Sequence, residues 1–276
     1  MRRGAHSASS LPGIDDILGT LPGHTRIAYS SLRRQRGAVV PHSEPALIEN
    51  DLDIVPVGMR SGDLLRRGDH ALFGVSTGNS YFTRRCLAEV MTWAVDRFAV
   101  VDVVHADVAL EEMLEAFGYE RPAAHRSVAK QLRGVRRRIK GALEDVGPDA
   151  GRVRVRPLSD FLDQPGYREV RAQVRTALQT DMELRSVRDA MAHQFLAKRL
   201  APGALPLPAQ TEAALDYVNA ELPFFVDTPH ILGVDSSVHC YHTVLALGRL
   251  LFGERPTGLL RPADTQGYAI VAACLA

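Results

Sequence analysis

The sequence predicts an α/β fold, with one Rossmann-like domain built around a mostly parallel sheet. Two short, continuous apolar runs, residues 70–75 and 98–104, have the length and composition of buried strands. Between them, from Asn79 to Phe98, apolar residues recur at helical spacing. A strand, a helix and a strand in this order form the right-handed crossover unit from which parallel sheets are built.

The same criteria locate the other elements. Asn79 or Ser80 is the expected N-cap of the crossover helix, because a short polar side chain there accepts a hydrogen bond from the first helical turn. We expect further helices at residues 110–117, 126–146, 159–200 with a break near Pro165, and 211–221, and further strands at residues 152–156, 224–226, 231–234 and 268–273. A proline-rich loop precedes residue 211. No internal repeat or linker divides the chain, so a single domain is predicted.

The chain has 276 residues, which is enough for a large α/β core. Residues 1–65 scatter Gly, Pro, Ser and Arg without a sustained period. We expect them to form a variable, partly disordered extension and residues 66–276 to form the domain. The formal net charge is only +1, so a nucleic-acid partner has to be inferred from the distribution of charge.

Cysteine usage and hydropathy indicate the compartment. The cysteines are Cys86, Cys240 and Cys274, without a CxxC spacing, which favours a reducing environment over a disulfide scaffold or a zinc site. No stretch has the apolar length of a membrane span, and no apolar run follows the initial Met1-Arg2-Arg3. We expect a cytoplasmic protein without a metal, with a monomer as the favoured oligomeric state.

A GxSxG pattern stands between the first predicted strand and its helix, at Gly74-Val-Ser76-Thr-Gly78. Flanking glycines permit a tight turn that exposes the serine. A helix that starts directly afterwards would point its free N–H groups and positive dipole end at the serine, where they would stabilise an oxyanion. The alternative is a glycine-rich turn with an incidental serine.

Three blocks of the sequence resemble the cyclodipeptide synthase family. The segment Gly74 to Phe82 resembles its nucleophile segment, Tyr217 to Pro229 its second catalytic segment, and Ser236 to His242 its third. They occur in the family's order and at about its spacing, and the similarity runs from about Asp69 to the C-terminus. Asn79, Tyr241 and His242 match the branch named for Asn, Tyr and His.

The resemblance implies a fold similar to the catalytic domain of class I tyrosyl- and tryptophanyl-tRNA synthetases. It also implies an aminoacyltransferase that makes a cyclic dipeptide (a 2,5-diketopiperazine) from two aminoacyl-tRNAs, by a ping-pong mechanism through aminoacyl- and dipeptidyl-enzyme on Ser76. Family members lack nucleotide-binding signatures, and this chain has no Walker loop and no GxGxxG. No cofactor is expected, because an aminoacyl-tRNA ester is already activated.

The resemblance assigns roles to individual residues. Tyr217 and Glu221 would bind the α-amino group of the aminoacyl moiety, with the glutamate moving its proton, and Tyr241 would assist proton transfer during cyclisation. Their i, i+4 spacing places Tyr217 and Glu221 on one helical face, although an ordinary surface pair has the same spacing. Tyr241 taken alone could equally be a core tyrosine. The expected supports of the nucleophile are Gly74, Gly78, Asn79 and His242.

Alignment of the blocks places two aminoacyl pockets. The first is expected to be lined by Leu72, Gly74, Val104, Phe224 and His239. The second is expected to include Met191, Gln194, Phe195 and Lys198. His239 is either a core histidine bonded to a backbone carbonyl or a pocket group that bonds a tyrosine hydroxyl or an indole N–H. Lys198 suggests a polar or acidic side chain on the second substrate. The sequence does not identify the two amino acids that are joined.

A basic stripe marks the helix predicted at residues 126–146. Its cations recur at spacings of four and three residues, opposite an apolar face of the same period, and no acidic residue lies between Arg126 and Lys140. Like charges repel on a helix, so an anionic partner such as a tRNA backbone is expected to compensate, as it does in the family. The expected contacts are Arg126, Lys130, Arg133, Arg136, Arg137, Arg138 and Lys140. A merely solvated arginine-rich face is the alternative.

Two other functions fit parts of the sequence. The first is an α/β-hydrolase with Ser76, one of Asp227 and Asp235, and one of His239 and His242, in the chain order Ser, Asp, His. No His-Gly-Gly-Gly oxyanion loop precedes its elbow. The second is a non-catalytic tRNA-binding module, which explains the basic stripe and leaves the serine turn without a role.

Overall fold

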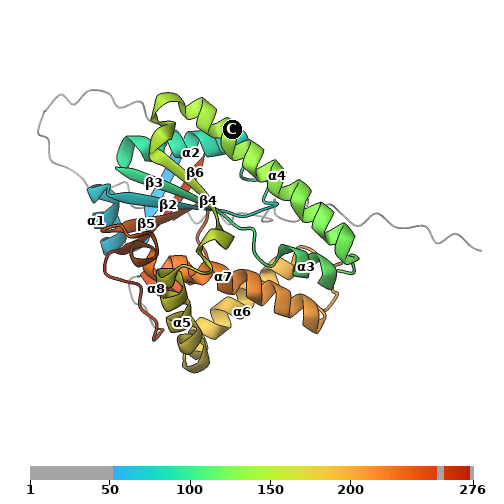
Figure 1. Ribbon diagram of the computed structural model, residues 1–276. Helices are drawn as coiled ribbons and strands as arrows, with labels where there is room; N and C mark the ends of the chain where they lie inside the picture. Colours follow the sequence, from blue (N-terminus) through green and yellow to red (C-terminus); the bar gives the residue numbers. More distant parts are fainter. Residues whose placement is uncertain (1–51, 254–257, 274–276) are drawn as a thin grey trace, which may run out of the picture.

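The computed structural model describes residues 52–253 and 258–273, which form an α/β domain (Figure 1). Its sheet has the strand order β1-β6-β5-β2-β3-β4. The strands are β1 (Leu52–Pro56), β2 (His70–Val75), β3 (Val100–His105), β4 (Val153–Pro157), β5 (Ser237–Tyr241) and β6 (Gln266–Ala273). All neighbours pair in parallel except β1 and β6, which are antiparallel. The predicted mostly parallel sheet is confirmed.

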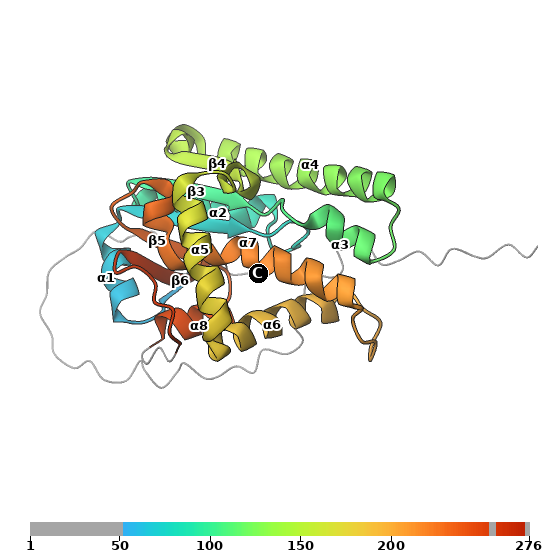
Figure 2. The same cartoon turned by 60° about the horizontal axis from the view of Figure 1, so that its bottom comes forward.

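Helices cover both faces of the sheet, as parallel sheets require (Figures 1 and 2). The helices α2 (Arg84–Arg97) and α4 (Arg121–Val146) pack on one face, over Phe73 and Val75. The other face carries α5 (Pro165–Thr180), α6 (Met182–Ala197), α7 (Pro208–Leu232) and α8 (Ala246–Phe252), over Leu72 and Val104. A short helix, α3 (Leu110–Ala116), contacts α4 and α7. None of the helices described here is long and apolar enough to cross a membrane.

The structure extends the folded core to residues that the sequence analysis placed in the extension. Residues 52–67 form β1 and α1 (Met59–Arg67). β1 pairs with β6, the last strand of the chain, and α1 packs against β6 as well. These contacts are made between the two ends of the described chain. The local sequence pattern of residues 52–67 therefore does not predict them. The rest of the predicted extension, residues 1–51, lies outside the described residues.

Two predicted strands and one predicted cap are wrong. Residues 224–226 and 231–232 belong to α7, which continues to Leu232 across a kink at Asp227 (φ −154°, ψ 68°). This part of α7 is buried almost all round, and a short apolar run cannot distinguish a buried helix from a strand. The N-cap of α2 is Thr83, whose hydroxyl accepts from the N–H of Cys86, instead of Asn79 or Ser80.

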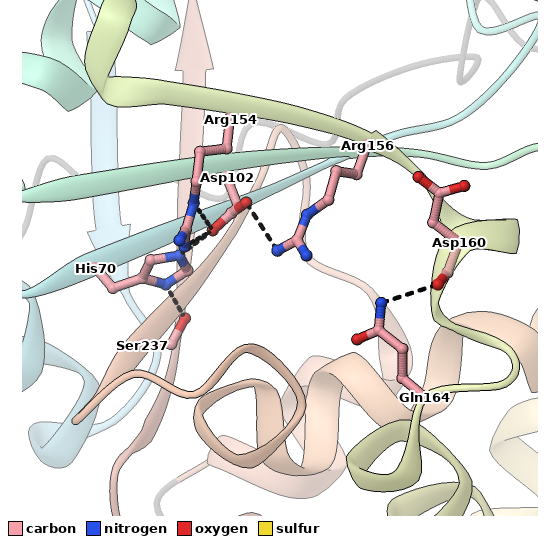
Figure 3. A network of polar contacts seen from close by, with 7 residues as sticks. All are labelled: His70, Asp102, Arg154, Arg156, Asp160, Gln164 and Ser237. Carbon is pink, nitrogen blue, oxygen red and sulfur yellow. Dashed lines mark hydrogen bonds and ion pairs between the residues drawn. The ribbon is translucent and has the colours of Figure 1, made fainter.

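A charged cluster ties four strands together on the face that carries α5 to α8 (Figure 3). Asp102 on β3 is fully buried and accepts hydrogen bonds from His70 on β2 and from Arg154 and Arg156 on β4. The other ring nitrogen of His70 lies 2.8 Å from Ser237 Oγ on β5. Burial alone would raise the pKa of Asp102, but the hydrogen bonds from His70 and Arg154 outweigh it and hold this pKa below its usual value.

We expect Asp102→Asn to lower the free energy of unfolding by about 3 kcal/mol, because breaking a buried ion pair leaves its cations uncompensated. Both guanidinium groups retain solvent contact, which keeps the loss at the low end of the range for such pairs. Urea unfolding monitored by circular dichroism measures the difference. Asp145→Asn is the matched control, since its ion pair with Arg84 is exposed and should contribute little. Equal stability of the two variants would contradict a structural role for the cluster.

Candidate active site

Ser76 lies directly after β2, where the parallel strands β2, β3 and β5 end together. The carboxyl ends of parallel strands are the usual location of sites in open α/β sheets. The N–H of Asn79 donates to the carbonyl of Ser76 over 3.3 Å and closes a tight turn. Gly78 within this turn has a φ of 82°, a conformation that favours glycine. The glycine pattern therefore serves a turn that leaves Ser76 at the sheet edge.

The expected contribution of a helix N-terminus at Ser76 is wrong. α2 begins at Arg84, eight residues after the serine, and its first-turn N–H at Cys86 is bonded to Thr83. The intervening residues form turns, because Asn79 directs its side-chain oxygen to the N–H of Tyr81 instead of capping a helix. The positive end of a helix dipole acts within the first turn only, so it does not act on Ser76 here.

The tertiary structure brings Ser76, Tyr217, Glu221 and Tyr241 together. The hydroxyl of Tyr241, at the end of β5, lies 3.1 Å from Ser76 Oγ. The hydroxyl of Tyr217, on α7, interacts with both Ser76 and Glu221. Ser76 and Tyr241, which are 165 residues apart in the sequence, thus lie within hydrogen-bonding distance of each other.

Burial controls the protonation of these groups. It raises the pKa of Glu221 to about 7, against an opposing hydrogen bond from Tyr217. Burial also raises the pKa of Tyr241 to about 12 and that of Tyr217 well above its usual value. Glu221 retains some solvent contact because it lines a cavity, but protein atoms surround its carboxylate. At neutral pH the site thus holds two protonated phenols and a carboxylate that can take up or release a proton.

Asn79 and His242 pack around these groups. Asn79 is buried, and its side chain interacts with the hydroxyl of Tyr241 while accepting from the N–H of Tyr81. The ring of His242 stacks on Tyr81, with centroids 4.1 Å apart, and meets Phe82 edge-on. Burial, assisted by the charge of Lys198, lowers the pKa of His242 to about 4, so the ring is neutral. Ser76 Oγ is hydrogen-bonded to Tyr241, whereas Asn79 and His242 contact the residues of the turn around it.

A cavity opens beside Ser76. Its wall contains all five residues expected for the first pocket, together with Ser76, Glu221 and Tyr241. The sequence analysis missed further lining residues, which are Val75, Ala106, Leu158, Phe225 and Leu245. Leu158 follows the edge strand β4, and Leu245 follows β5, so only the packing of distant segments shows that they line the cavity.

His239 bonds to a backbone carbonyl, as the first alternative predicts, and it also lines the cavity. Its Nδ1 lies 3.4 Å from the carbonyl oxygen of Phe224, to which Nδ1–H donates. In this tautomer Nε2 is an acceptor. A Cβ added to Gly74 would lie 3.4 Å from Nε2, so this nitrogen faces the cavity floor. Burial lowers the pKa of His239 to about 4, so the ring stays neutral.

The residues expected for the second pocket lie on one face of α6 and at its C-cap, which is Lys198. Met191 and Phe195 are partly buried, whereas Gln194 and Lys198 are exposed. Phe195 stacks on Tyr217 with ring centroids 5.1 Å apart, which places this face beside the group of Ser76, Tyr217, Glu221 and Tyr241. The sequence analysis missed Arg199, whose guanidinium lies 3.3 Å from the centre of the Phe195 ring. Burial lowers the pKa of Arg199 to about 10.

The basic stripe lies on the outer surface of α4. Val128, Val135 and Ile139 are buried against the domain. Of the seven predicted cations, Arg138 is partly buried and six are exposed. The exposed ones are Arg126, Lys130, Arg133, Arg136, Arg137 and Lys140. Within the described residues, no carboxylate lies within ion-pair distance of those six. The helix thus carries a column of positive charge that the described part of the chain leaves uncompensated.

The geometry of an α/β-hydrolase is not assembled. Ser76 is hydrogen-bonded to a tyrosine, and His239 bonds to a backbone carbonyl. Asp227 accepts from the backbone N–H of His230. In the described chain only Ala109 combines a side chain with a positive φ, so Ser76 lacks the strained backbone of a hydrolase elbow. Among these same residues no group of three or more His, Cys, Asp or Glu side chains could hold a metal ion.

The fold and the site together define a class: Rossmann-like α/β proteins with a serine at the strand ends and no assembled hydrolase triad. Two solved structures are similar to the chain. A crystal structure of cyclo(L-leucyl-L-phenylalanyl) synthase aligns with a TM-score of 0.76 and 37% identity, covering 82% of this chain and 100% of that one. A Mycobacterium tuberculosis protein, whose structure relates cyclodipeptide synthetases to type I tRNA synthetases, aligns with a TM-score of 0.71 and 36% identity over 87% and 99% of the two chains.

The chain belongs to the cyclodipeptide synthase family, whose model matches residues 52–273. Cyclo(L-tyrosyl-L-tyrosyl) synthase of M. tuberculosis is 41% identical over 204 residues, which are 74% of this chain and 70% of the relative. Cyclo(L-leucyl-L-phenylalanyl) synthase of Streptomyces noursei is 39% identical over 215 residues, 78% and 89% of the two chains. The family resemblance in the sequence is therefore confirmed.

Proposed function

We propose that this cyclodipeptide synthase takes its two amino acids from two aminoacyl-tRNAs and carries them on Ser76. The observation that supports this most directly is the meeting of Ser76, Glu221 and Tyr241 at one cavity, with Tyr217 interacting with both Ser76 and Glu221. A serine flanked by two phenols and a carboxylate of near-neutral pKa has a nucleophile and the groups that move protons around it.

The proposed reaction has three acyl transfers. Ser76 Oγ attacks the ester carbonyl of the first aminoacyl-tRNA, and the ribose oxygen leaves with a proton, which gives aminoacyl-Ser76. The α-amino group of this aminoacyl moiety then attacks the ester of the second aminoacyl-tRNA, which gives dipeptidyl-Ser76 and a second free tRNA. Finally, the new terminal amine attacks the Ser76 ester, so the ring closes and Ser76 recovers its proton. Each ester is already activated, and no nucleotide is consumed.

Glu221 and Tyr217 are proposed to hold the α-amino group of aminoacyl-Ser76. A carboxylate attracts an ammonium, and a carboxylate with a pKa near 7 can also accept the proton that the amine must lose to become a nucleophile. Tyr217 contacts both Glu221 and Ser76 and would orient the ammonium between them. Tyr241, bonded to Ser76 Oγ, is placed to return a proton to the serine when the ring closes.

The first aminoacyl side chain is proposed to enter the cavity at Leu72, Gly74, Val104, Phe224 and His239. Its walls are mostly apolar, and His239 Nε2 offers one hydrogen-bond acceptor. A tyrosyl or tryptophanyl side chain, which brings one donor on an apolar ring, matches this lining. The second side chain is proposed to lie on the α6 face at Met191, Gln194, Phe195 and Lys198.

Incubation of the purified protein with charged tRNA tests this function. Mass spectrometry should detect a cyclic dipeptide, and tyrosyl- or tryptophanyl-tRNA should be preferred over phenylalanyl-tRNA for the first residue. Release of free amino acids alone would indicate the hydrolase, and binding without turnover would indicate the tRNA-binding module. Because charged tRNA is the proposed substrate, the reaction is assigned to the cytoplasm.

The basic stripe is proposed to bind the tRNA backbone, and the triple variant Arg133→Ala, Arg137→Ala, Lys140→Ala tests it. Each phosphate contact releases counterions when tRNA binds. Because the variant loses three such contacts, we expect it to bind charged tRNA more weakly, and we expect the slope of log affinity against log salt concentration to fall by about 2–3. The thermal midpoint should hardly change, because the three side chains are exposed. Fluorescence anisotropy from low to high salt measures both quantities. Unchanged affinity and an unchanged slope would leave the stripe as a solvated face.

A further inference from the structure

Arg136 differs from its neighbours on the stripe in its contact with the domain. Its Nε lies 3.4 Å from Nε2 of His105 and donates to it. The adjacent cation Arg137 is also exposed and has no ion pair with any carboxylate of the described chain. One cation of the stripe therefore donates to a buried side chain of the domain, whereas its neighbour is exposed and in no ion pair of the described chain.

His105 occupies a position from which it can affect the nucleophile. It is the last residue of β3, is 2% exposed, and pairs in register with Val75, the residue before Ser76. Because its Nε2 accepts from Arg136, its Nδ1 carries the proton, and this buried atom has no hydrogen-bond partner in another residue of the described chain. The bond to Arg136 is thus the side-chain hydrogen bond that orients the His105 ring.

The residue after His105 holds the chain on both sides of Ser76. The N–H of Ala106 donates to the carbonyl of Val75 over 3.0 Å, and the carbonyl of Ala106 accepts from the hydroxyl of Thr77. Ala106 and Thr77 are buried. The end of β3 is therefore hydrogen-bonded to the residues on both sides of Ser76. A displacement of this strand end would displace Ser76 as well.

We infer that Arg136 is a positioning residue for the nucleophile and not a phosphate ligand. It fixes His105 from α4, and through the strand end at residues 105–106 it sets the position of Ser76. This inference rests on the proposed function, and it separates Arg136 from the other cations that the sequence predicts to bind tRNA. Misplacing a reacting group by a fraction of an ångström lowers the rate of the chemical step, whereas losing a phosphate contact weakens binding.

Single substitutions distinguish the two roles. Arg136→Ala is compared with Arg137→Ala, and with Arg175→Ala on α5 as a control for the loss of an exposed charge. We expect Arg136→Ala to lower kcat about tenfold, with charged tRNA and with a minimal aminoacyl ester that lacks the tRNA body, and to leave KM and the salt slope near their wild-type values. Arg137→Ala should raise KM for charged tRNA and reduce the salt slope by about one.

Arg136→Lys sharpens the comparison. Lysine keeps the positive charge on the stripe but places a methylene group where Nε donates, so kcat should fall as it does for alanine. Recovery of kcat by lysine, or an Arg136→Ala variant that raises KM and flattens the salt slope in the manner of Arg137→Ala, would overturn the inference.

An NMR readout separates this inference from the proposed function. In wild-type protein labelled with ¹⁵N-histidine, the His105 ring should show the tautomer protonated at Nδ1. Arg136→Ala should shift its Nε2 resonance, and Arg137→Ala should not. A wild-type protein that makes no cyclic dipeptide from charged tRNA would refute the proposed function, whereas an Nε2 resonance insensitive to Arg136 would refute the contact itself.

Discussion

Ser76→Ala is expected to abolish formation of the cyclic dipeptide. The first proposed transfer forms an ester on Ser76 Oγ, the second extends the acyl group that this ester holds, and the third breaks it. The neighbouring phenols of Tyr217 and Tyr241 have pKa values raised by burial, so neither supplies an equivalent nucleophile. Removing a catalytic serine typically lowers turnover at least about 10³-fold. Product formation measured by liquid chromatography with mass spectrometry gives the rate.

Intact-protein mass spectrometry provides a second readout for this variant. Wild-type protein mixed with one charged tRNA should gain the mass of an aminoacyl group, and the alanine variant should not. Ser80→Ala is the matched control, because Ser80 lies in the same segment and is exposed. Product formation by the Ser76→Ala variant at a rate comparable with wild type would show that the reaction does not pass through a covalent serine intermediate.

Glu221→Gln is expected to cause the other large loss of activity. Glutamine preserves the shape of the side chain but neither attracts an ammonium as a carboxylate does nor accepts its proton. We expect the first acyl transfer to Ser76 to persist and the second to fail, so that aminoacyl-enzyme accumulates or is hydrolysed. Turnover should fall about 10²–10⁴-fold, the usual contribution of a general base. Glu212→Gln, at an exposed position of the same helix, is the control.

The pH dependence of the wild-type protein should report Glu221. With a pKa raised to about 7, the carboxylate is protonated in a growing fraction of molecules as pH falls below 7, and kcat should fall with it. The Glu221→Gln variant should lack this acidic limb in its residual activity. A wild-type profile that is flat from pH 6 to pH 8, or full activity of the glutamine variant, would exclude Glu221 from proton transfer.

The raised pKa of Glu221 also predicts how stability depends on pH: stability should fall as the pH rises, whereas activity should fall as the pH falls. A carboxyl group whose folded-state pKa is raised stabilises the fold below its unfolded pKa, and this stability is lost as pH rises through the folded value near 7. At pH 8 the wild-type protein carries a buried charge that glutamine lacks. We therefore expect Glu221→Gln to raise the free energy of unfolding by about 2 kcal/mol at pH 8, after allowance for residual solvent contact, and by much less at pH 5.

The sequence by itself determined the features that depend on local pattern. Buried strands at residues 70–75 and 98–104 with an apolar-faced helix between them specify a parallel sheet, and the structure contains β2, α2 and β3 there. Glycine spacing specified a turn at the serine, and a 3.6-residue period specified which face of α4 is buried. These features follow from steric preference and periodicity, which act over a few residues.

Only the tertiary structure decided the features that depend on register and packing between distant segments. Whether residues 224–232 continue a helix is a question of what surrounds them, because the helix is buried almost all round and its apolar residues have no distinguishing period. Two contacts depend on partners elsewhere in the chain: the pairing of β1 with β6 and the hydrogen bond between Arg136 and His105. The cap at Thr83 depends on which local hydrogen bond forms. The proximity of Tyr241 to Ser76 and the pKa of Glu221 near 7 exist only because the strand ends meet α7 and exclude water there.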